Sequence, residues 1–397
     1  MTDAFLCSGV RSPVGRRGGV LSTVRPDDLL AHCIKEAVAR SSFDPASIED
    51  VVAGCTSQSG EDARNVGRHA GLLAGLPVEV AGQTVNRLCG SGLAAIADCR
   101  RAILCHEGDV FVAGGVESMS RAPFVISKSE AAFQRKLAIF EALGERFPNP
   151  KVHQNFGAES MPETGDNVAA ELGISRAEAD RFAFASQVKY EAARAAGFFD
   201  GEIAPVAISG RKGDTIVGAD EHPRPGTTLE GLAGLKTLFR EGVVTAGNAS
   251  GVNDGAAALI IASGSAVERV SAKPLARIVG SAVAGVAPRV MGLGPVPASR
   301  KALDRAGLTL DQIDVIELNE AFASQALGCM KQLGIAADDA RVNPMGGAIA
   351  IGHPLGMSGA RIALSAARQL HNGAGRYALV TMCIGLGQGI AVILEKA

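Results

Sequence analysis

Short apolar runs alternate along the chain with longer amphipathic stretches. The runs are rich in β-branched residues and include residues 51–53, 109–113, 314–318 and 377–381. Runs of this length and composition predict strands, whereas stretches in which apolar residues recur every three or four positions predict helices. Strands that alternate with helices are typical of an α/β protein. The pattern therefore predicts the α/β fold class.

Three segments in the first part of the chain resemble three segments near its end. The pairs are residues 47–54 with 312–318, residues 89–96 with 356–363, and residues 108–114 with 375–381. The offset within each pair is about 267 residues, and a constant offset indicates a repeated structural unit. We therefore expect two duplicated halves.

Residues 119–250, between the two halves, have a different pattern. Glycine turns become rarer, a helical stretch covers residues 175–196, and the loop at residues 220–228 is dense in turn-forming residues. Ser175 and Glu178 form the capping-box pattern that starts a helix. The expected units are an N-terminal half over residues 1–118 that is completed by residues 251–273, an inserted loop domain over residues 119–250, and a C-terminal half over residues 274–397.

Composition and charge exclude several kinds of partner. The chain has 397 residues, and its 39 Lys and Arg residues nearly balance its 41 Asp and Glu residues. Binding to nucleic acid or to an anionic membrane requires a basic surface that this balance does not indicate. No apolar stretch approaches the ~20 residues of a membrane span, and the first residues lack the pattern of a secretory signal. We expect a soluble, cytoplasmic protein.

The eight cysteines and seven histidines form no metal-binding pattern. No Cys-x-x-Cys pair occurs, and the spacing fits neither a zinc site nor a disulfide framework. We therefore expect no metal, and reduced thiols of which most are core residues. No G-x-G-x-x-G segment follows a predicted strand, so a nicotinamide cofactor is not expected.

Four segments hold nearly all the polar residues that could perform chemistry: residues 86–92, 319–323, 346–359 and 383–389. The chain has 49 glycines, about 12% of its residues against a usual share of about 7%, and ten of them fall in these segments. Glycine permits tight turns and lets the backbone approach a ligand closely. The four segments are therefore the candidate functional site.

Cys89 is expected to follow a strand at residues 84–85 and to open a helix over residues 90–101. Backbone N–H groups at a helix N-terminus favour a thiolate, and a lowered pKa makes a cysteine nucleophilic. The small residues that follow Cys89 leave room for a substrate. The alternative is a buried core cysteine, which remains the expectation for Cys7, Cys33, Cys55, Cys99, Cys105 and Cys329.

Three further residues could act with Cys89. His353 lies in a glycine-rich loop before a helix expected to start near Ser358, where it could serve as a base or donate to an oxyanion, or simply be an exposed loop histidine. Cys383 ends an apolar strand and precedes alternating glycines, which suits a second acid/base thiol beside an oxyanion hole or ordinary strand-end packing. Asn319, followed by Glu320, lies at the carboxyl end of a strand, where it could hold a water or cap the next helix.

Taken in order, these segments resemble the thiolase family. Residues 10–15, 114–120 and 247–255 are also similar to that family, so the resemblance runs essentially from end to end. It implies two similar halves with mixed five-stranded sheets stacked around central helices, and a loop domain inserted in the first half. It further implies that coenzyme A is a substrate, that no cofactor is needed, and that the chain forms a homodimer or homotetramer.

The resemblance also implies a mechanism. Cys89, activated by His353, would attack the 3-keto carbon of a 3-oxoacyl-CoA, release acetyl-CoA and carry the shortened acyl group until free CoA collects it. Cys383 would protonate the departing carbanion. His353 and a water on Asn319 would form one oxyanion hole, and the N–H groups of Cys89 and Gly385 the second.

Other residues are implied to bind the substrate. Contacts with CoA are implied for Arg224, Phe239, Ala246 and Ser250, and contacts near the acyl end for Met161, Met291 and Phe322. Residues 60–65, 160–164, 220–226 and 285–291 are similar to the 3-oxoadipyl-CoA branch of the family, which acts in bacterial aromatic catabolism. Two departures from related sequences are the Cys-Gly-Ser-Gly-Leu order at Cys89 and the serine at position 160.

Four alternatives stay open at this point. Within the thiolase family, the substrate could instead be acetoacetyl-CoA or a medium-chain 3-oxoacyl-CoA. A decarboxylating ketosynthase would share the doubled architecture. A catalytically silent CoA-binding scaffold would share the fold without the chemistry.

Overall fold

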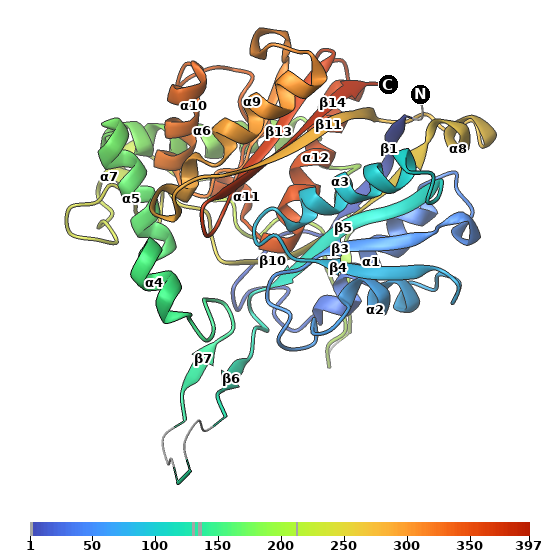
Figure 1. Cartoon of the computed structure of the whole chain (residues 1–397), viewed down its shortest axis with the longest axis horizontal. Helices are drawn as coiled ribbons and strands as arrows, with labels where there is room; N and C mark the ends of the chain where they lie inside the picture. The colour runs from blue at the N-terminus through green and yellow to red at the C-terminus, as the bar shows by residue number, and fades with distance from the viewer. Residues whose placement is uncertain (1–2, 129–131, 134–136, 212) are drawn as a thin grey trace.

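The two halves of the chain build sheets with the same strand order (Figure 1). The structure, a computed structural model, describes residues 3–128, 132–133, 137–211 and 213–397. The strands of the N-terminal half are, in spatial order, β1 (Ala4–Arg11), β10 (Asn253–Ser263), β5 (Val110–Ser118), β3 (Asp50–Gly54) and β4 (Ala81–Val85), with the short β2 (Gly15–Arg16) beside β10. Those of the C-terminal half are β11 (Ala276–Gly285), β14 (Gln388–Lys396), β13 (Tyr377–Ile384) and β12 (Val315–Leu318).

Strand directions match between the halves as well. β3 runs parallel to β5 as β12 runs parallel to β13, and β10 is antiparallel to its neighbours as β14 is to its own. Within the described residues, β4 has as its counterpart in the second half only an isolated parallel bridge from Val342 to Ile316. The duplication predicted from sequence is therefore confirmed, but the expected fifth strand of the second sheet is reduced to this bridge.

The two sheets are joined edge to edge. β1 and β11 pair antiparallel through Phe5 with Arg277 and Leu6 with Ala276, so the strands form one ten-stranded mixed sheet. The family resemblance implied two mixed five-stranded sheets, and the sequence holds no signal for a contact of only two residue pairs.

The direction of the side chains alternates along each strand, which explains why helices cover both faces of the sheet. In β5, Val110 and Val112 pack with the outer helices of the N-terminal half, whereas Phe111 and Ala113 face the central helices. Successive side chains of a strand point to opposite faces, so a strand of purely apolar residues must be covered on both sides. In β13, Leu379 and Val380 likewise point to opposite faces of the sheet and belong to different apolar clusters.

Two central helices fill the space between the halves. They are α3 (Ser91–Leu104) and α12 (Leu355–His371), and α12 contacts strands of both sheets. The outer helices are α1 (Pro26–Ala39), α2 (Val66–Leu73) and α8 (Gly264–Arg269) in the first half, and α9 (Pro295–Ala306), α10 (Ala323–Leu333) and α11 (Ala348–Ile351) in the second. Short 3₁₀ helices are η1 (Pro45–Ser47), η2 (Pro288–Leu293) and η3 (Leu310–Gln312). Each fully buried Leu or Ile in the central layer contributes roughly 1.5–3 kcal/mol.

The chain leaves the first sheet at Ser118, where β5 ends, and returns at Asn253, where β10 begins. The elements between are β6 (Phe124–Ile126), β7 (Ile139–Glu141), α4 (Pro150–Phe156), α5 (Met161–Leu172), α6 (Arg176–Ala195), β8 (Val206–Ile208), β9 (Thr215–Val217) and α7 (Leu229–Ala233). The β6–β7 hairpin projects away from the rest of the molecule (Figure 1). The capping box predicted at the start of α6 is confirmed, since the Ser175 N–H donates to Glu178 Oε2 over 2.7 Å.

All eight cysteines are free. Cys33, Cys55, Cys99 and Cys329 are buried, as predicted, and Cys7 is half-buried. Cys105 is exposed, because it follows the last turn of α3 at the edge of the central layer, so the core expectation for that residue is wrong.

Candidate active site

Cys89 lies in a tight turn between β4 and α3. The turn is closed by hydrogen bonds of 3.0 Å from Gly90 N–H to the Arg87 carbonyl and from Ser91 N–H to the Leu88 carbonyl. Leu88 has a φ of 46°, a left-handed conformation that few non-glycine residues adopt and that is frequent at functional sites. The turn places Cys89 at the entrance of α3, as the sequence predicted.

The predicted lowering of the Cys89 pKa is wrong for the free protein. Burial raises its pKa to about 11, and the nearby Glu117 charge adds to that effect. Hydrogen bonding from the Gly385 N–H acts in the opposite direction but is the smaller effect. Desolvation disfavours the charged form of any thiol, and here it outweighs the helix N-terminus. Cys89 is therefore a neutral thiol in the resting protein.

His353 is only 4% exposed, so the alternative of an exposed loop histidine is wrong. Its Nδ1 lies 2.6 Å from Ser358 Oγ, and that hydroxyl donates to the Pro354 carbonyl. The Ser358 oxygen therefore accepts from Nδ1–H, which leaves Nε2 as an unprotonated acceptor. α12 begins at Leu355, earlier than expected, so that Ser358 lies in its first turn and can hold the imidazole.

The environment keeps His353 neutral. Burial, with a smaller contribution from the positive charge of Arg361, lowers its pKa to about 3. Gly352, just before it, has a φ of 108°, and a Cβ there would lie 2.7 Å from the Asn253 side chain. Asn253 in turn accepts from the His353 N–H over 2.9 Å. Only glycine allows this approach, so the loop holds a neutral imidazole in a fixed place.

Asn319 faces His353 from the end of β12. Its Nδ2 lies 3.4 Å from His353 Nε2, and its Oδ1 is buried without a hydrogen-bond partner among the described residues. Since α10 begins only at Ala323 and is preceded by Phe322 at the cap position, the helix-cap alternative for Asn319 is wrong. An unsatisfied buried oxygen of this kind is a site for a bound water.

Glu320, the neighbour of Asn319, stabilises the His353 loop. It accepts from Ser186 Oγ over 2.7 Å, from Asn343 Nδ2 over 2.7 Å and from the Ile349 N–H over 3.1 Å. Burial raises its pKa, and these donors oppose that shift. Glu320 is therefore occupied in holding the backbone next to the site.

Cys383 is 1% exposed near the end of β13, where it pairs with Gly389 of β14. Burial raises its pKa well above the usual value, and the proximity of Cys89 raises it further. Because Gly385 N–H bonds to Cys89, the β13–β14 turn and the Cys89 turn meet. The two thiols are therefore neighbours and both are protonated at rest.

Residues predicted near the acyl end gather around Cys383. Met291 and Phe322 belong to the same apolar cluster as Cys383. Met161 is 42% exposed, and its Sδ would lie 3.8 Å from a Cβ built on Gly385. The three side chains form an apolar wall beside the second thiol.

Predicted CoA contacts lie in the segment between the halves. Arg224 and Ala246 line a pocket of about 190 Å³, together with His222, Leu235 and other residues. Ser250 donates its N–H to the Ala321 carbonyl over 3.0 Å, which connects this segment to the Asn319 loop. Phe239, 39% exposed, does not line the pocket. The structure therefore brings two of the four predicted contacts together.

Ser358 and Asn253 were not singled out from the sequence, although both orient His353. A signal was present, because Ser358 lies within the glycine-rich segment and Asn253 within residues 247–255, which carried the family resemblance. Their hydrogen bonds join positions that only the folded chain brings together.

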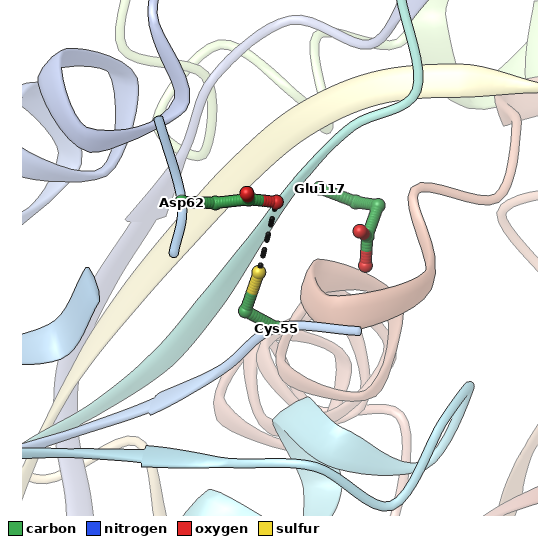
Figure 2. Close-up of side chains that lie close together, drawn as sticks. All are labelled: Cys55, Asp62 and Glu117. Carbon is green, nitrogen blue, oxygen red and sulfur yellow. Dashed lines mark hydrogen bonds between the residues drawn. The ribbon is translucent and has the colours of Figure 1, made fainter. Parts of the chain in front are cut away.

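Cys55, Asp62 and Glu117 form the one group in the described part of the chain whose ligand atoms could hold a metal ion (Figure 2). Their ligand atoms lie within 4.8 Å of one another. However, Asp62 accepts from three backbone N–H groups and Glu117 from five donors. Carboxylates so occupied by N–H and O–H donors are poor metal ligands, so the group is better described as a hydrogen-bond network.

Comparison with known proteins shows which protein family the chain belongs to. Residues 4–265 match the family description "Thiolase, N-terminal domain" and residues 272–396 match "Thiolase, C-terminal domain". The chain therefore belongs to the thiolase family, whose members are acyltransferases that use CoA as a substrate. The decarboxylating ketosynthase alternative is wrong.

Individual relatives and solved structures are similar to this chain over its full length. The "3-oxoadipyl-CoA/3-oxo-5,6-dehydrosuberyl-CoA thiolase" of Escherichia coli (strain K12) is 58% identical, covering 100% of both chains. The "Beta-ketoadipyl-CoA thiolase" of Pseudomonas aeruginosa is 56% identical over 99% of both. The crystal structure of human mitochondrial 3-ketoacyl-CoA thiolase in complex with CoA superposes with a TM-score of 0.92 at 41% identity, covering 100% of this chain and 98% of that one. No helix among the described residues is long and apolar enough to cross a membrane.

Proposed function

We propose that this thiolase cleaves 3-oxoadipyl-CoA with free CoA, giving acetyl-CoA and the shortened acyl-CoA. The reaction type is supported by one observation, namely that the starts of α3 and α12, which Cys89 and His353 precede, pack against each other at Gly92 and Gly356. The choice of substrate is supported by the names of relatives that are 58% and 56% identical over essentially the whole chain.

The first step is attack by Cys89. His353 Nε2, the unprotonated nitrogen, takes the thiol proton as the sulfur adds to the C3 carbonyl carbon, whose oxygen becomes an oxyanion. The oxyanion then re-forms the carbonyl while the C2–C3 bond breaks. The electron pair of that bond leaves with the acetyl-CoA carbanion, and Cys383 supplies the proton that makes acetyl-CoA.

The second step returns the acyl group to CoA. The Cys383 thiolate takes the proton of the incoming CoA thiol, and the CoA sulfur attacks the Cys89 thioester. When the thioester breaks, Cys89 recovers its proton from His353. Both cysteines and the imidazole are then neutral again, as in the resting protein.

Two oxyanion holes support these steps. In the first, protonated His353 Nε2 donates to the oxyanion together with a water held by the unpartnered Asn319 Oδ1. In the second, the N–H groups of Cys89 and Gly385 bind the thioester oxygen. Preorganised donors in a buried site stabilise developing charge without reorganisation, which is often the largest contribution to catalysis.

The segment over residues 119–250 is proposed as the CoA-binding domain. The pocket lined by Arg224 and Ala246 supports this assignment, because Arg224 offers a cation and a backbone turn to an anionic ligand. Phe239, on an exposed loop, would pack against the adenine or pantetheine from outside the pocket, and Ser250 would bind at the junction with the Asn319 loop. Met161, Met291 and Phe322 would enclose the acyl end.

The protein is further proposed to act as a cytoplasmic homodimer or homotetramer. The β6–β7 hairpin exposes Phe124 by 71%, Ile126 by 59% and Ile139 by 63%, and β4 ends the sheet with an open edge. Apolar patches and open edges are typical of surfaces covered by a second copy. Free cysteines suit a reducing compartment. Light scattering should give a dimer or tetramer mass, and a monomer would contradict the assignment.

The test of the substrate is a thiolysis comparison of 3-oxoadipyl-CoA, acetoacetyl-CoA and a medium-chain 3-oxoacyl-CoA. We expect the highest kcat/KM with 3-oxoadipyl-CoA. Preference for either other compound would move the protein to the corresponding branch of the family. A silent CoA-binding scaffold would show no turnover with any of them, and mass spectrometry would find no acyl group on Cys89.

A further inference from the structure

Glu117 is a buried carboxylate next to the candidate site that the proposed mechanism does not use. It lies near the end of β5 with 0% exposure, one residue before the chain leaves the sheet. Figure 2 shows its carboxyl group beside Cys55 and Asp62, pointing towards the first turn of α12. A buried charge with no ionic partner requires a reason for its presence.

Five donors surround the Glu117 carboxylate. Oε2 accepts from Thr56 N–H over 3.1 Å, Thr56 Oγ1 over 2.7 Å and Gly356 N–H over 2.9 Å. Oε1 accepts from Ser57 N–H over 3.0 Å and Ser57 Oγ over 2.7 Å. Every neighbour donates, which is the arrangement an ionised carboxylate accepts. Burial raises the pKa of Glu117, and the five donors oppose that shift.

The donors belong to both halves of the molecule. Thr56 and Ser57 follow β3 in the first half, whereas Gly356 lies in the first turn of α12 in the second. The backbones are in close contact here, because a Cβ on Gly115 would lie 2.1 Å from the Gly356 carbonyl oxygen and one on Gly54 would lie 2.7 Å from it. Glu117 therefore joins three segments that leave no room for side chains.

The two donor segments each lead to a proposed catalytic residue. Thr56 accepts at its carbonyl from Asn86 Nδ2 over 3.4 Å, and Asn86 Oδ1 accepts from Leu88 N–H over 2.9 Å, next to Cys89. On the other side, the turn of α12 that contains Gly356 also carries Ser358, which holds the His353 imidazole. A continuous set of hydrogen bonds therefore runs from the Cys89 turn through Glu117 to the His353 turn.

We propose that Glu117 is a positioning residue, whose carboxylate fixes the Cys89 turn relative to the His353 turn and places a negative charge near the Cys89 thiol. The inference rests on the proposed function, because it assigns a purpose to the relative placement of a thiol and its base. Small displacements of reacting groups cost much activity, which gives such a residue a large effect without substrate contact.

Two substitutions separate position from charge. Glu117→Asp keeps the charge but shortens the side chain, and Glu117→Gln keeps the length but replaces an acceptor with an NH₂ group. We expect kcat for thiolysis to fall about 10- to 100-fold in both variants, with KM for CoA within about twofold. The matched control is Glu395→Gln, a buried carboxylate at the far end of β14, which should leave kcat unchanged.

The pH dependence of Cys89 alkylation tests the effect of the Glu117 charge alone. The Glu117 charge raises the pKa of Cys89, so in Glu117→Gln the rate of Cys89 alkylation by iodoacetamide should shift to lower pH even though kcat falls. In Glu117→Asp the alkylation profile should stay in place. A structural defect would lower activity without moving the profile in this charge-specific way. The proposal is overturned if kcat stays within twofold in both variants or if the Glu117→Gln profile does not shift.

Circular dichroism and Tm establish whether the variants fold. If they do not, the Thr56→Val, Ser57→Ala double variant removes two hydroxyl donors and keeps the carboxylate. It should lower kcat about tenfold with an unmoved alkylation profile, and an unchanged kcat would overturn the proposal. Failure of the unmodified protein to thiolyse any 3-oxoacyl-CoA would instead contradict the proposed function, so the two failures are distinguishable.

Discussion

The two halves share a sheet but differ in how they connect equivalent strands. In the C-terminal half, β13 passes to β14 through a turn of three residues, Gly385 to Gly387. In the N-terminal half, β5 and β10 have the same antiparallel pairing, yet residues 119–252 lie between them. The short turn keeps Cys383 and the Gly385 N–H beside Cys89, and the long connection supplies the pocket with Arg224. On the proposed function, one architecture thus separates chemistry from CoA binding.

The two central helices begin next to different chemical residues. Cys89 precedes α3 and His353 precedes α12, at equivalent places of the duplicated fold. The starts of the two helices are in contact, because a Cβ on Gly92 of α3 would lie 2.7 Å from the Gly356 carbonyl oxygen of α12. On the proposed function, divergence of two equivalent loops yields a nucleophile in one and a base in the other.

The largest expected effect comes from removing the nucleophile of the N-terminal half. Cys89→Ser should lower kcat for thiolysis by at least about 10³-fold, because a serine hydroxyl is a far weaker nucleophile at neutral pH. Cys105→Ser, at the other end of α3, is the matched control and should retain activity. Near-normal thiolysis in Cys89→Ser would refute the assignment of roles to the two halves.

The next largest effect is expected from removing the second thiol, which lies near the end of β13 in the C-terminal half. Cys383→Ala should lower kcat about 10²- to 10⁴-fold, the range typical of a lost acid/base group. Transfer of an acetyl group from acetyl-CoA to Cys89 is the reverse of the second proposed step and needs no carbanion, so it should be slowed less than thiolysis, and mass spectrometry should still detect acetylated Cys89. Equal slowing of thiolysis and of acetylation would contradict a role of Cys383 at the carbanion. Cys33→Ala, in the core, is the control.

A smaller effect is expected in the long connection. Arg224→Ala should raise KM for CoA about tenfold and leave kcat nearly unchanged, because it removes binding that is equal in the ground and transition states. Steady-state kinetics with varied CoA checks this. Arg211→Ala, in the same segment but outside the pocket, should have no effect. A fall in kcat alone would mean that the connection takes part in the chemistry.

The mildest test concerns pH. Since burial raises the pKa of Cys89 to about 11, its thiolate fraction keeps increasing through the alkaline range. Alkylation of free enzyme by iodoacetamide should therefore accelerate with pH towards about 11, with Cys89→Ser giving the background rate. A plateau near neutrality would indicate a preformed thiolate and would restore the expectation drawn from the sequence.

Local patterns predicted much of this molecule. The strands, the duplication and the capped start of α6 follow from periodicity and short motifs, which act within a few residues. The four chemical segments could be found because each combines a reactive side chain with glycines. Most of their residues do meet in the structure.

What the sequence missed depends on burial and on distant contacts. The helix N-terminus suggested a lowered pKa for Cys89, but Cys89 is packed, half-buried, against the central layer, and desolvation has no local signature in the sequence. The neutral state of His353 likewise results from burial and from Arg361. The buried Asn319 Oδ1, which has no hydrogen-bond partner among the described residues, is recognisable only once α10 is seen to start beyond it. The joint between β1 and β11, which consists of two residue pairs, likewise has no signal in the sequence.

That joint has a consequence for how the protein folds. Two residue pairs hold the sheets together at their edges, whereas α12 is buried along most of its length against strands of both halves. Neither half can bury its apolar interior alone, because α12 packs against strands of both halves. The halves of the duplicated chain are therefore interdependent in folding, and a cut between them would leave two fragments that must associate to become structured.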